Sequence, residues 1–191
     1  MSDTLLWYTT RGAGAISLLL LSAVVVLGIS SVRRFEAAGW PRFLTTGLHR
    51  NLSLTAVVFL TIHIVTALAD PFTHLGWVPA VIPFGSSYRT FWLGLGTIAV
   101  ELMLAVVVTS LLRRLVGQPA WRAVHWLAYA CWPIAVVHSW GTGTDSRSAW
   151  LIAVDAACLL AVAIALATRL WTPAPDPLGE ARAGFRQRVH R

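Results

Sequence analysis

Four histidines in two apolar stretches are the residues best placed to do chemistry. His49 and His63 lie 14 positions apart, and His125 and His138 lie 13 positions apart. Ionisable side chains inside membrane-spanning segments are rare and usually functional. Imidazole binds metals and carries protons. Two histidines in each of two stretches, at nearly equal spacing, are therefore a stronger signal than any one of them alone.

The composition around these histidines is that of a membrane protein. The chain has 191 residues, of which 57% are hydrophobic and 12% charged, and its mean hydropathy is +0.68. Soluble domains carry about 25% charged residues. The net charge of +7 comes with 15 arginines and no lysine. These arginines sit at the ends of apolar runs rather than on one basic face, which argues against a nucleic-acid partner.

Five stretches are long and apolar enough to cross a bilayer, which needs about 20 such residues. They are residues 12–32, 51–69, 90–112, 123–140 and 148–168. Residues 75–85 contain two prolines and are too short to span, so they are expected to form an interfacial loop or lid. The sequence thus predicts an all-α integral membrane protein, a five-helix transmembrane bundle over residues 1–171. Residues 172–191 would be a short basic tail.

The arginines orient this bundle. Twelve of the 15 fall between spans one and two, between spans three and four, or after span five, and only Arg11, Arg89 and Arg147 fall on the other side. Because the arginine-rich side is normally cytoplasmic, we expect the N-terminus outside and the C-terminus in the cytoplasm. Spans two and four then run parallel to each other, in a multi-pass protein of a bacterial cell membrane.

Parallel spans place the histidines in two level pairs. Fourteen helical residues rise about 21 Å and return to within roughly 40° of the same face. His49 is therefore expected level with His125 near the inner edge, and His63 level with His138 near the outer edge. Two imidazoles across a helix gap can hold both axial positions of a haem iron. A zinc site is a poor alternative because zinc needs three or four ligands converging on one point.

The 13-residue spacing is awkward for the second helix. In an ideal helix it leaves His125 and His138 about 140° apart. Pro133 lies between them, and proline bends or rewinds a helix. We therefore expect a local distortion at residues 130–134 that turns His138 toward His63.

Several short motifs resemble the ferric reductase-like transmembrane family, a group related to NADPH oxidases and to the haem subunit of a bacterial methionine sulfoxide reductase system. The resemblance covers about residues 7–170. Its most specific elements are the runs Arg11-Gly12-Ala13-Gly14, Leu48-His49-Arg50-Asn51-Leu52 before His63, and His125-Trp126-Leu127-Ala128-Tyr129 before His138.

This resemblance implies two b-type haems, held by His49 and His125 on the inner side and by His63 and His138 on the outer side. It further implies electron transfer from a cytoplasmic donor to an outer acceptor such as ferric iron. The chain departs from the family in three ways. Oxidases carry another histidine where this chain has Ala67, and they have six spans rather than five. No flavin or nicotinamide domain follows the bundle, so the expected donor is a separate flavoprotein or a quinol.

Four arginines are candidates for binding haem propionates, since guanidinium pairs with carboxylate in a bidentate manner. Arg11 and Arg89 lie at the outer ends of spans one and three, and Arg50 and Arg122 lie near the inner histidines. Interfacial anchoring and the positive-inside bias explain them equally well.

Other polar residues give weaker signals. Glu101 and Asp155 lie within spans, where a carboxylate could balance haem charge, relay a proton or simply pack as a hydrogen-bonded acid. His74 with Asp70 could collect a metal ion in an outer loop, and Asp145 could line an acceptor entry. The two cysteines, Cys131 and Cys158, lie in apolar runs and are expected to be inert and buried.

The sequence therefore favours an oxidoreductase membrane subunit that carries electrons through two haems. Two alternatives remain. The chain could be a haem membrane anchor for a separate redox enzyme, or a non-redox transporter that uses its histidines directly for protons or metal ions.

Overall fold

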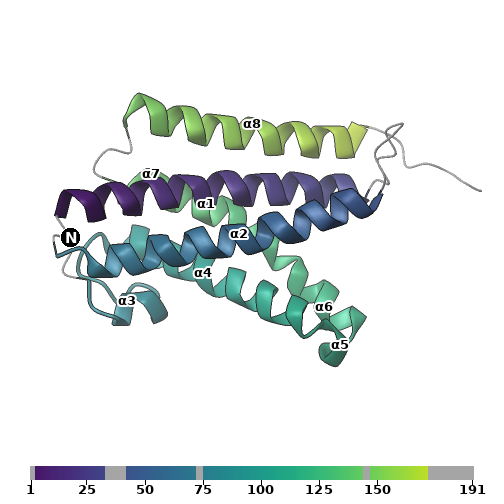
Figure 1. Cartoon of the computed structure of the whole chain (residues 1–191), viewed down its shortest axis with the longest axis horizontal. Coiled ribbons are helices and arrows are strands. Elements are labelled where there is room, and N and C mark those ends of the chain that lie inside the picture. Colours follow the sequence, from purple (N-terminus) through teal and green to yellow (C-terminus); the bar gives the residue numbers. More distant parts are fainter. Residues whose placement is uncertain (1–2, 33–41, 72–74, 144–146, 172–191) are drawn as a thin grey trace, which may run out of the picture.

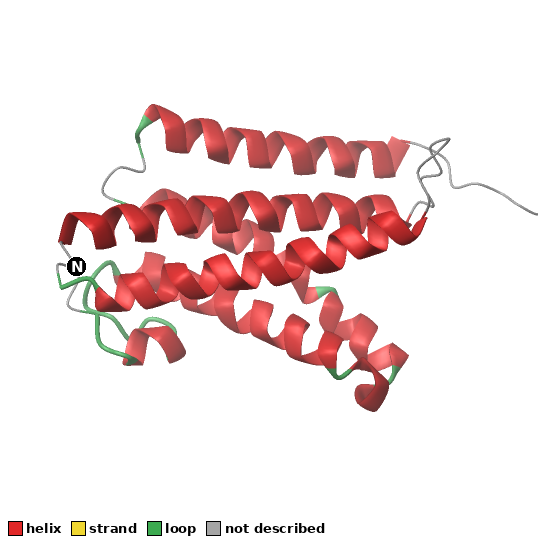
Figure 2. Cartoon of the chain, in the orientation of Figure 1, coloured by secondary structure: helices red, strands yellow, loops and turns green. Residues whose placement is uncertain are grey.

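The computed structural model describes residues 3–32, 42–71, 75–143 and 147–171. Every regular element among these residues is a helix, as Figure 2 shows. The elements are α1 (Asp3–Val32), α2 (Arg42–Ala69), α3 (Val78–Val81), α4 (Thr90–Leu111), α5 (Arg113–Val116), α6 (Gln118–His125), α7 (Leu127–Thr142) and α8 (Ala149–Trp171). The all-α class expected from the sequence is confirmed.

Four of these helices, α1, α2, α4 and α8, are long and apolar enough to cross a membrane. Their most apolar stretches have a mean hydropathy of 2.2 to 2.4. Large apolar side chains also cover their outer faces, such as Val58 on α2 and Leu160 on α8, which are 57% and 62% exposed. A helix that is apolar all round belongs in a lipid environment. These four helices suggest a multi-pass membrane protein.

The stretch expected to form the fourth span is divided between α6 and α7. Helix α7 has 16 residues, or about 24 Å of rise, which is short for a hydrocarbon core of about 30 Å. Helix α6 adds 8 residues before it. Only the two together have the length of a span.

The distortion between His125 and His138 lies elsewhere than predicted. Helix α7 runs without a break through Pro133, so the expected distortion at residues 130–134 is wrong. The interruption lies at Trp126, whose carbonyl accepts a bond from the backbone N–H of Tyr129, three residues on. A three-residue step winds the chain more tightly than an α-helix and changes the direction in which later side chains point.

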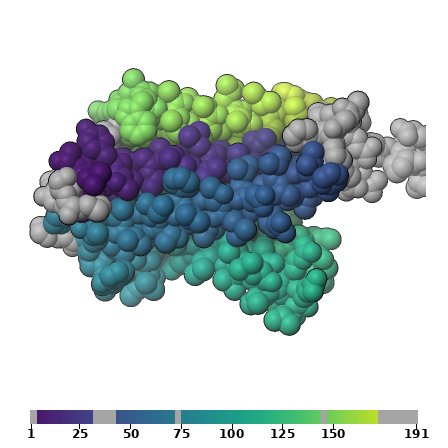
Figure 3. Space-filling model, viewed as in Figure 1, coloured from purple at the N-terminus to yellow at the C-terminus, as the bar shows by residue number. Residues whose placement is uncertain are grey.

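The helices form a bundle around α1 (Figure 1). Helix α1 packs against α2, α7 and α8, and α4 packs against α7, α6 and the short α3. Helices α1 and α2 lie side by side in opposite directions, with the start of α1 beside the end of α2. In the space-filling view, α4, α5 and α6 form a prominence below α2 (Figure 3). The four histidines are carried by three of these helices, α2, α6 and α7.

Trp132 of α7 links the buried core. It packs against all three clusters of buried apolar side chains, which come from α1, α4, α7 and α8. Its indole Nε1 donates to Ser22 Oγ on α1 at 2.9 Å. Cys131 and Cys158 are free and buried within these clusters, as expected. One tryptophan thus holds α1 and α7 at a fixed distance along their middle.

Ile29 provides a test of this packing. Its side chain is 1% exposed and belongs to the cluster that includes Val162 and Ala165 of α8, whereas Ile164 on α8 is 54% exposed. We expect Ile29→Ala to lower the free energy of unfolding by about 2–5 kcal/mol because it leaves a cavity. The matched change Ile164→Ala should cost less than about 0.5 kcal/mol. Denaturant or thermal unfolding of the solubilised protein measures both, and equal losses would contradict this arrangement.

Candidate functional site

The four histidines meet in two facing pairs. His63 of α2 faces His138 of α7 with ring centres 6.4 Å apart and planes at 83°. His49 of α2 faces His125 of α6 with ring centres 6.2 Å apart and planes at 57°. Helix α2 supplies one member of each pair, and the turn at Trp126 separates the other two. The level pairing expected from the sequence is present.

The separation of the rings suits one metal between each pair. A metal–imidazole bond is about 2.0 Å, and the ring centre lies about 1.15 Å behind the bonding nitrogen. Two imidazoles on opposite sides of one metal therefore have centres about 6.3 Å apart. The observed values of 6.2 and 6.4 Å match this separation.

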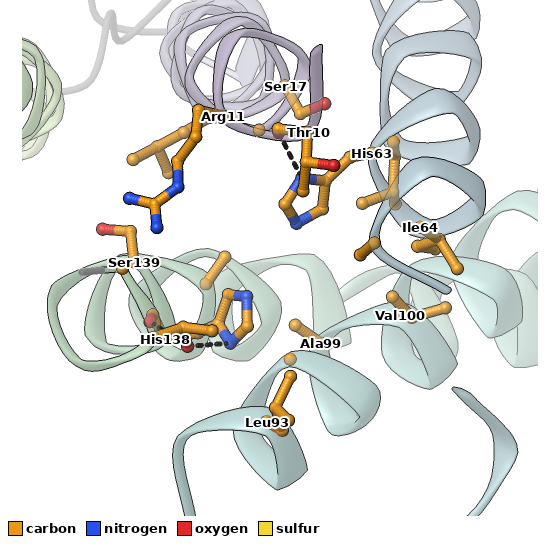
Figure 4. Close-up of a pocket in the computed structure, with 18 of the residues that line it drawn as sticks. Thr10, Arg11, Ser17, His63, Ile64, Leu93, Ala99, Val100, His138 and Ser139 are labelled. Atoms are coloured by element: carbon orange, nitrogen blue, oxygen red, sulfur yellow. Dashed lines mark hydrogen bonds between the residues drawn. The ribbon is translucent and has the colours of Figure 1, made fainter. Parts of the chain in front are cut away.

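Backbone carbonyls fix three of the four rings. The Nδ1 atom of His63 bonds Thr10 O at 2.7 Å, that of His138 bonds Trp92 O at 2.8 Å, and that of His49 bonds Val24 O at 3.1 Å. Figure 4 shows the bond between His63 and Thr10. A carbonyl can only accept, so Nδ1 carries the proton in each ring. The Nε2 lone pair is then free for a ligand, which is the arrangement of metal-bound histidines.

His125 is held differently. Its Nδ1 atom is buried and has no hydrogen-bond partner among the described residues. Its ring instead packs on Trp121, with centres 5.1 Å apart. The indole of Trp121 donates to Ser110 Oγ on α4 at 3.2 Å. Sequence reasoning missed this support for the inner pair, although the spacing of four residues between Trp121 and His125 on one helix would have suggested it.

A cavity of about 270 Å³ surrounds the outer pair. It is lined by His63 and His138, by mainly apolar side chains of α1, α2, α4 and α7, and by Leu75, Pro79 and Ala80 of the loop that carries α3. Thr97 on α4 ties this loop down by donating to Pro79 O at 2.6 Å. The loop expected to act as an interfacial lid therefore does close over one side of the cavity.

Arg11 is the arginine that the structure brings to the outer pair. It lines the cavity, and its guanidinium lies 4.8 Å from the centre of the Trp7 ring. Figure 4 shows the guanidinium pointing from α1 toward the helix that carries Ser139 and His138. The buried carboxylate of Asp70 lines the same cavity. The positive charge of Arg11 and the negative charge of Asp70 thus lie in the same cavity as the two rings.

Arg89 is not brought to the cavity. It adopts a left-handed backbone conformation (φ 42°) just before α4, and its side chain donates to the carbonyls of Gly141 and Gly143. These bonds join the start of α4 to the end of α7. Beside them, the ring of Trp92 covers Gly141 so closely that a Cβ there would overlap it. Arg89 therefore joins two helices, and its contact with a haem propionate stays a prediction.

The two carboxylates within the spans differ in burial and in whether they line the cavity. Glu101 is exposed on α4. Asp155 of α8 is 6% exposed, lines the cavity, and accepts a hydrogen bond from Ser139 Oγ at 3.2 Å. Ser139 directly follows His138, so Asp155 is hydrogen-bonded to the residue next to one member of the outer pair. Asp155 belongs to the candidate site, and Glu101 does not.

The remaining candidates lie at the edge of the site or outside the described residues. Arg50 and Arg122 are exposed near the inner histidines. His74, Asp145 and the tail 172–191 lie outside the described residues. Within the described ranges, no group of three or more His, Cys, Asp or Glu side chains converges as a metal-ion site would require.

Comparisons with protein-family models, with curated proteins and with solved structures gave no match. The geometry of the two pairs and the sequence motifs are therefore the features that bear on function.

Arg89 yields a prediction for the outer end of the bundle. Arg89→Gln removes the cation that donates to two carbonyls at the end of α7, and we expect it to lower the free energy of unfolding by about 1 kcal/mol. The control Arg114→Gln, at an exposed position of α5, should change it by less than about 0.5 kcal/mol. Thermal unfolding of both solubilised variants measures the difference. Identical midpoints would show that Arg89 does not join the helices.

Proposed function

We propose that this chain is a transmembrane electron carrier in which the histidine pairs hold two b-type haems. His49 and His125 would bind one haem iron, and His63 and His138 the other. The observation that carries the proposal is the separation of ring centres, 6.2 and 6.4 Å, which is that of two imidazoles sharing one iron. The resemblance of the histidine motifs to ferric reductase-like proteins supports it.

The chemistry of the donor set agrees with this assignment. Three rings donate Nδ1–H to helix carbonyls, which leaves neutral Nε2 atoms to face the gap. Hydrogen bonds of this kind hold a ligating ring in place and raise its basicity. When bound, haem b would supply an iron centre that accepts and releases one electron at a time. Mainly apolar side chains line the cavity around the outer pair.

The two pairs lie near opposite ends of the bundle. Along α2, the 14 residues from His49 to His63 rise about 21 Å, or most of the thickness of a hydrocarbon core. No single side chain spans that distance. Electron transfer from the cytoplasm outward is favoured by a membrane potential that is negative inside, by about 2.3 kcal/mol per 100 mV.

The proposal includes the topology of the chain. We propose five spans, with α6 and α7 together forming the fourth, in a bacterial cell membrane. The arginine distribution favours an outer N-terminus and a cytoplasmic C-terminus. In that orientation Arg11 lies beside the outer haem and would pair with its propionates, while Arg50 and Arg122 lie on the side of the inner haem. The electron donor would be a separate flavoprotein or a quinol, and the acceptor an external species such as ferric iron.

Haem quantitation on histidine variants tests the proposal. We expect the purified wild type to be red, with a reduced b-type spectrum and two haems per chain. His63→Ala and His125→Ala should each retain one haem, and each should lose a different spectral or redox component, because the two residues belong to different pairs. The control His190→Ala, in the tail, should keep both haems.

Two results would contradict this proposal. A folded but colourless wild type that binds metal ions would favour the transporter alternative. Loss of the same component in both variants would show that the two pairs do not act as separate sites. Reduction of the haems by a quinol or by a flavoprotein would show which of the two proposed donors acts, and the membrane-anchor alternative requires the quinol.

Asp155 provides a second test. Because its carboxylate lines the outer cavity and contacts Ser139, we propose that it balances charge as the outer site gains and releases an electron. Asp155→Ala should slow the reduction of an external ferric chelate by about ten-fold while haem content stays unchanged. Glu101→Ala, the matched loss of an exposed carboxylate on α4, should leave the rate unaltered. If both variants reduced the ferric chelate at the same rate, Asp155 would have only a packing role.

A further inference from the structure

Each carbonyl that holds a histidine is followed four residues later by a glycine. Thr10 O holds His63 and is followed by Gly14, Val24 O holds His49 and is followed by Gly28, and Trp92 O holds His138 and is followed by Gly96. In each case the imidazole is the nearest group that a Cβ on this glycine would meet. The same arrangement thus occurs three times, on two different helices.

Helix geometry explains why a glycine is needed at this position. Cα–Cβ bonds tilt toward the N-terminus of a helix, so a side chain covers the turn that precedes it. The side chain four residues after a carbonyl therefore lies over that carbonyl oxygen. Without it, a ring from a neighbouring helix can reach the oxygen while the carbonyl remains part of its own helix.

The spaces left by the three glycines differ in how closely they fit the histidine ring. A Cβ on Gly96 would lie 2.5 Å from Cε1 of His138, and one on Gly14 would lie 2.9 Å from Cε1 and Nδ1 of His63. Both distances are shorter than van der Waals contact allows, and an imidazole ring cannot bend. A Cβ on Gly28 would lie 3.6 Å from Cε1 of His49, which is an ordinary contact. Gly12, two residues before Gly14, has nothing within 4 Å.

We propose that Gly14 and Gly96 are positioning residues for the outer histidine pair. Their missing side chains let His63 and His138 reach the carbonyls of Thr10 and Trp92, and this fixes both the plane of each ring and the nitrogen that carries its proton. Gly28 has the same relation to His49 but leaves room for a methyl group. The inference rests on the proposed function, since the purpose of this positioning is to aim two Nε2 atoms at one iron.

Other glycines of the long helices show that close helix packing does not explain where these three glycines occur. Gly94 lies beside Gly96, yet a Cβ there would meet the ring of Phe84. Gly47 of α2 has nothing within 4 Å. Among the helix glycines that the structure describes, only those four residues after the three acceptor carbonyls would meet a histidine. Their positions therefore follow the hydrogen bonds rather than the helix contacts.

Four alanine variants of the full chain test the proposal. Gly14→Ala and Gly96→Ala should each at least halve the occupancy of the outer haem, or shift its low-spin electron paramagnetic resonance signal, while the inner haem keeps its wild-type signal. Gly12→Ala and Gly28→Ala are the matched controls and should keep both signals. A merely destabilising substitution would lower both haems together and would reduce the unfolding midpoint in proportion.

A second measurement needs no substitution. In ¹⁵N-histidine-labelled wild type, reduced so that low-spin iron is diamagnetic, we expect hydrogen-bonded Nδ1–H resonances for His49, His63 and His138 and a weakly bonded one for His125. This decides the proposal if the glycine variants do not accumulate. In a wild type without haem, which would overturn the proposed function, the same three rings should still be Nδ1–H tautomers.

The results that overturn the inference are distinct from those that overturn the function. A wild type with two haems, together with Gly14→Ala and Gly96→Ala variants that match Gly12→Ala in both signals, leaves the function standing and removes the positioning role. Nε2–H tautomers at His63 and His138 in a haem-free protein would remove it as well.

Discussion

The hydrogen bond from a histidine Nδ1–H to a helix carbonyl is the interaction on which the rest of the structure depends. It selects the tautomer, because a carbonyl can only accept, and it sets the plane of the ring. Thr10, Val24 and Trp92 each provide such an oxygen. In a membrane interior, where no water is present to hydrogen-bond polar groups, these bonds also give the buried imidazoles a partner.

The helices are arranged so that each of these rings meets its carbonyl. Helix α1 offers carbonyls at two levels to the two histidines of α2, and α4 offers one to α7. Trp132 and Ser22 hold α1 and α7 together between the levels. The inner pair is less symmetric, because His125 relies on the face of Trp121 instead of a carbonyl. The two sites therefore offer different surroundings to whatever they bind.

Much of this arrangement follows from the sequence, and the parts that do not share a physical cause. Residue types and spacing placed His49, His63, His125 and His138 in two level pairs, because helical rise and phase are nearly constant. The break at Trp126 was misplaced to Pro133, since a proline on an exposed face can be carried by a helix that neighbouring contacts support. The faces of Glu101 and Asp155 and the direction of Arg89 depend on tertiary packing, which spacing along one helix does not contain. The acceptor carbonyls belong to the backbone, so residue types do not predict them, except through the glycines that expose them.

The distribution of the four histidines over helices has a mechanical consequence. Both sites share the rigid helix α2, so a sliding or rotation of α2 would displace one ring of each pair simultaneously. Their opposite members stand on either side of the turn at Trp126. A change of angle at that turn would move His125 while leaving His138 seated on α4. The bundle thus contains one element that couples the two sites and one joint that can adjust the inner site by itself.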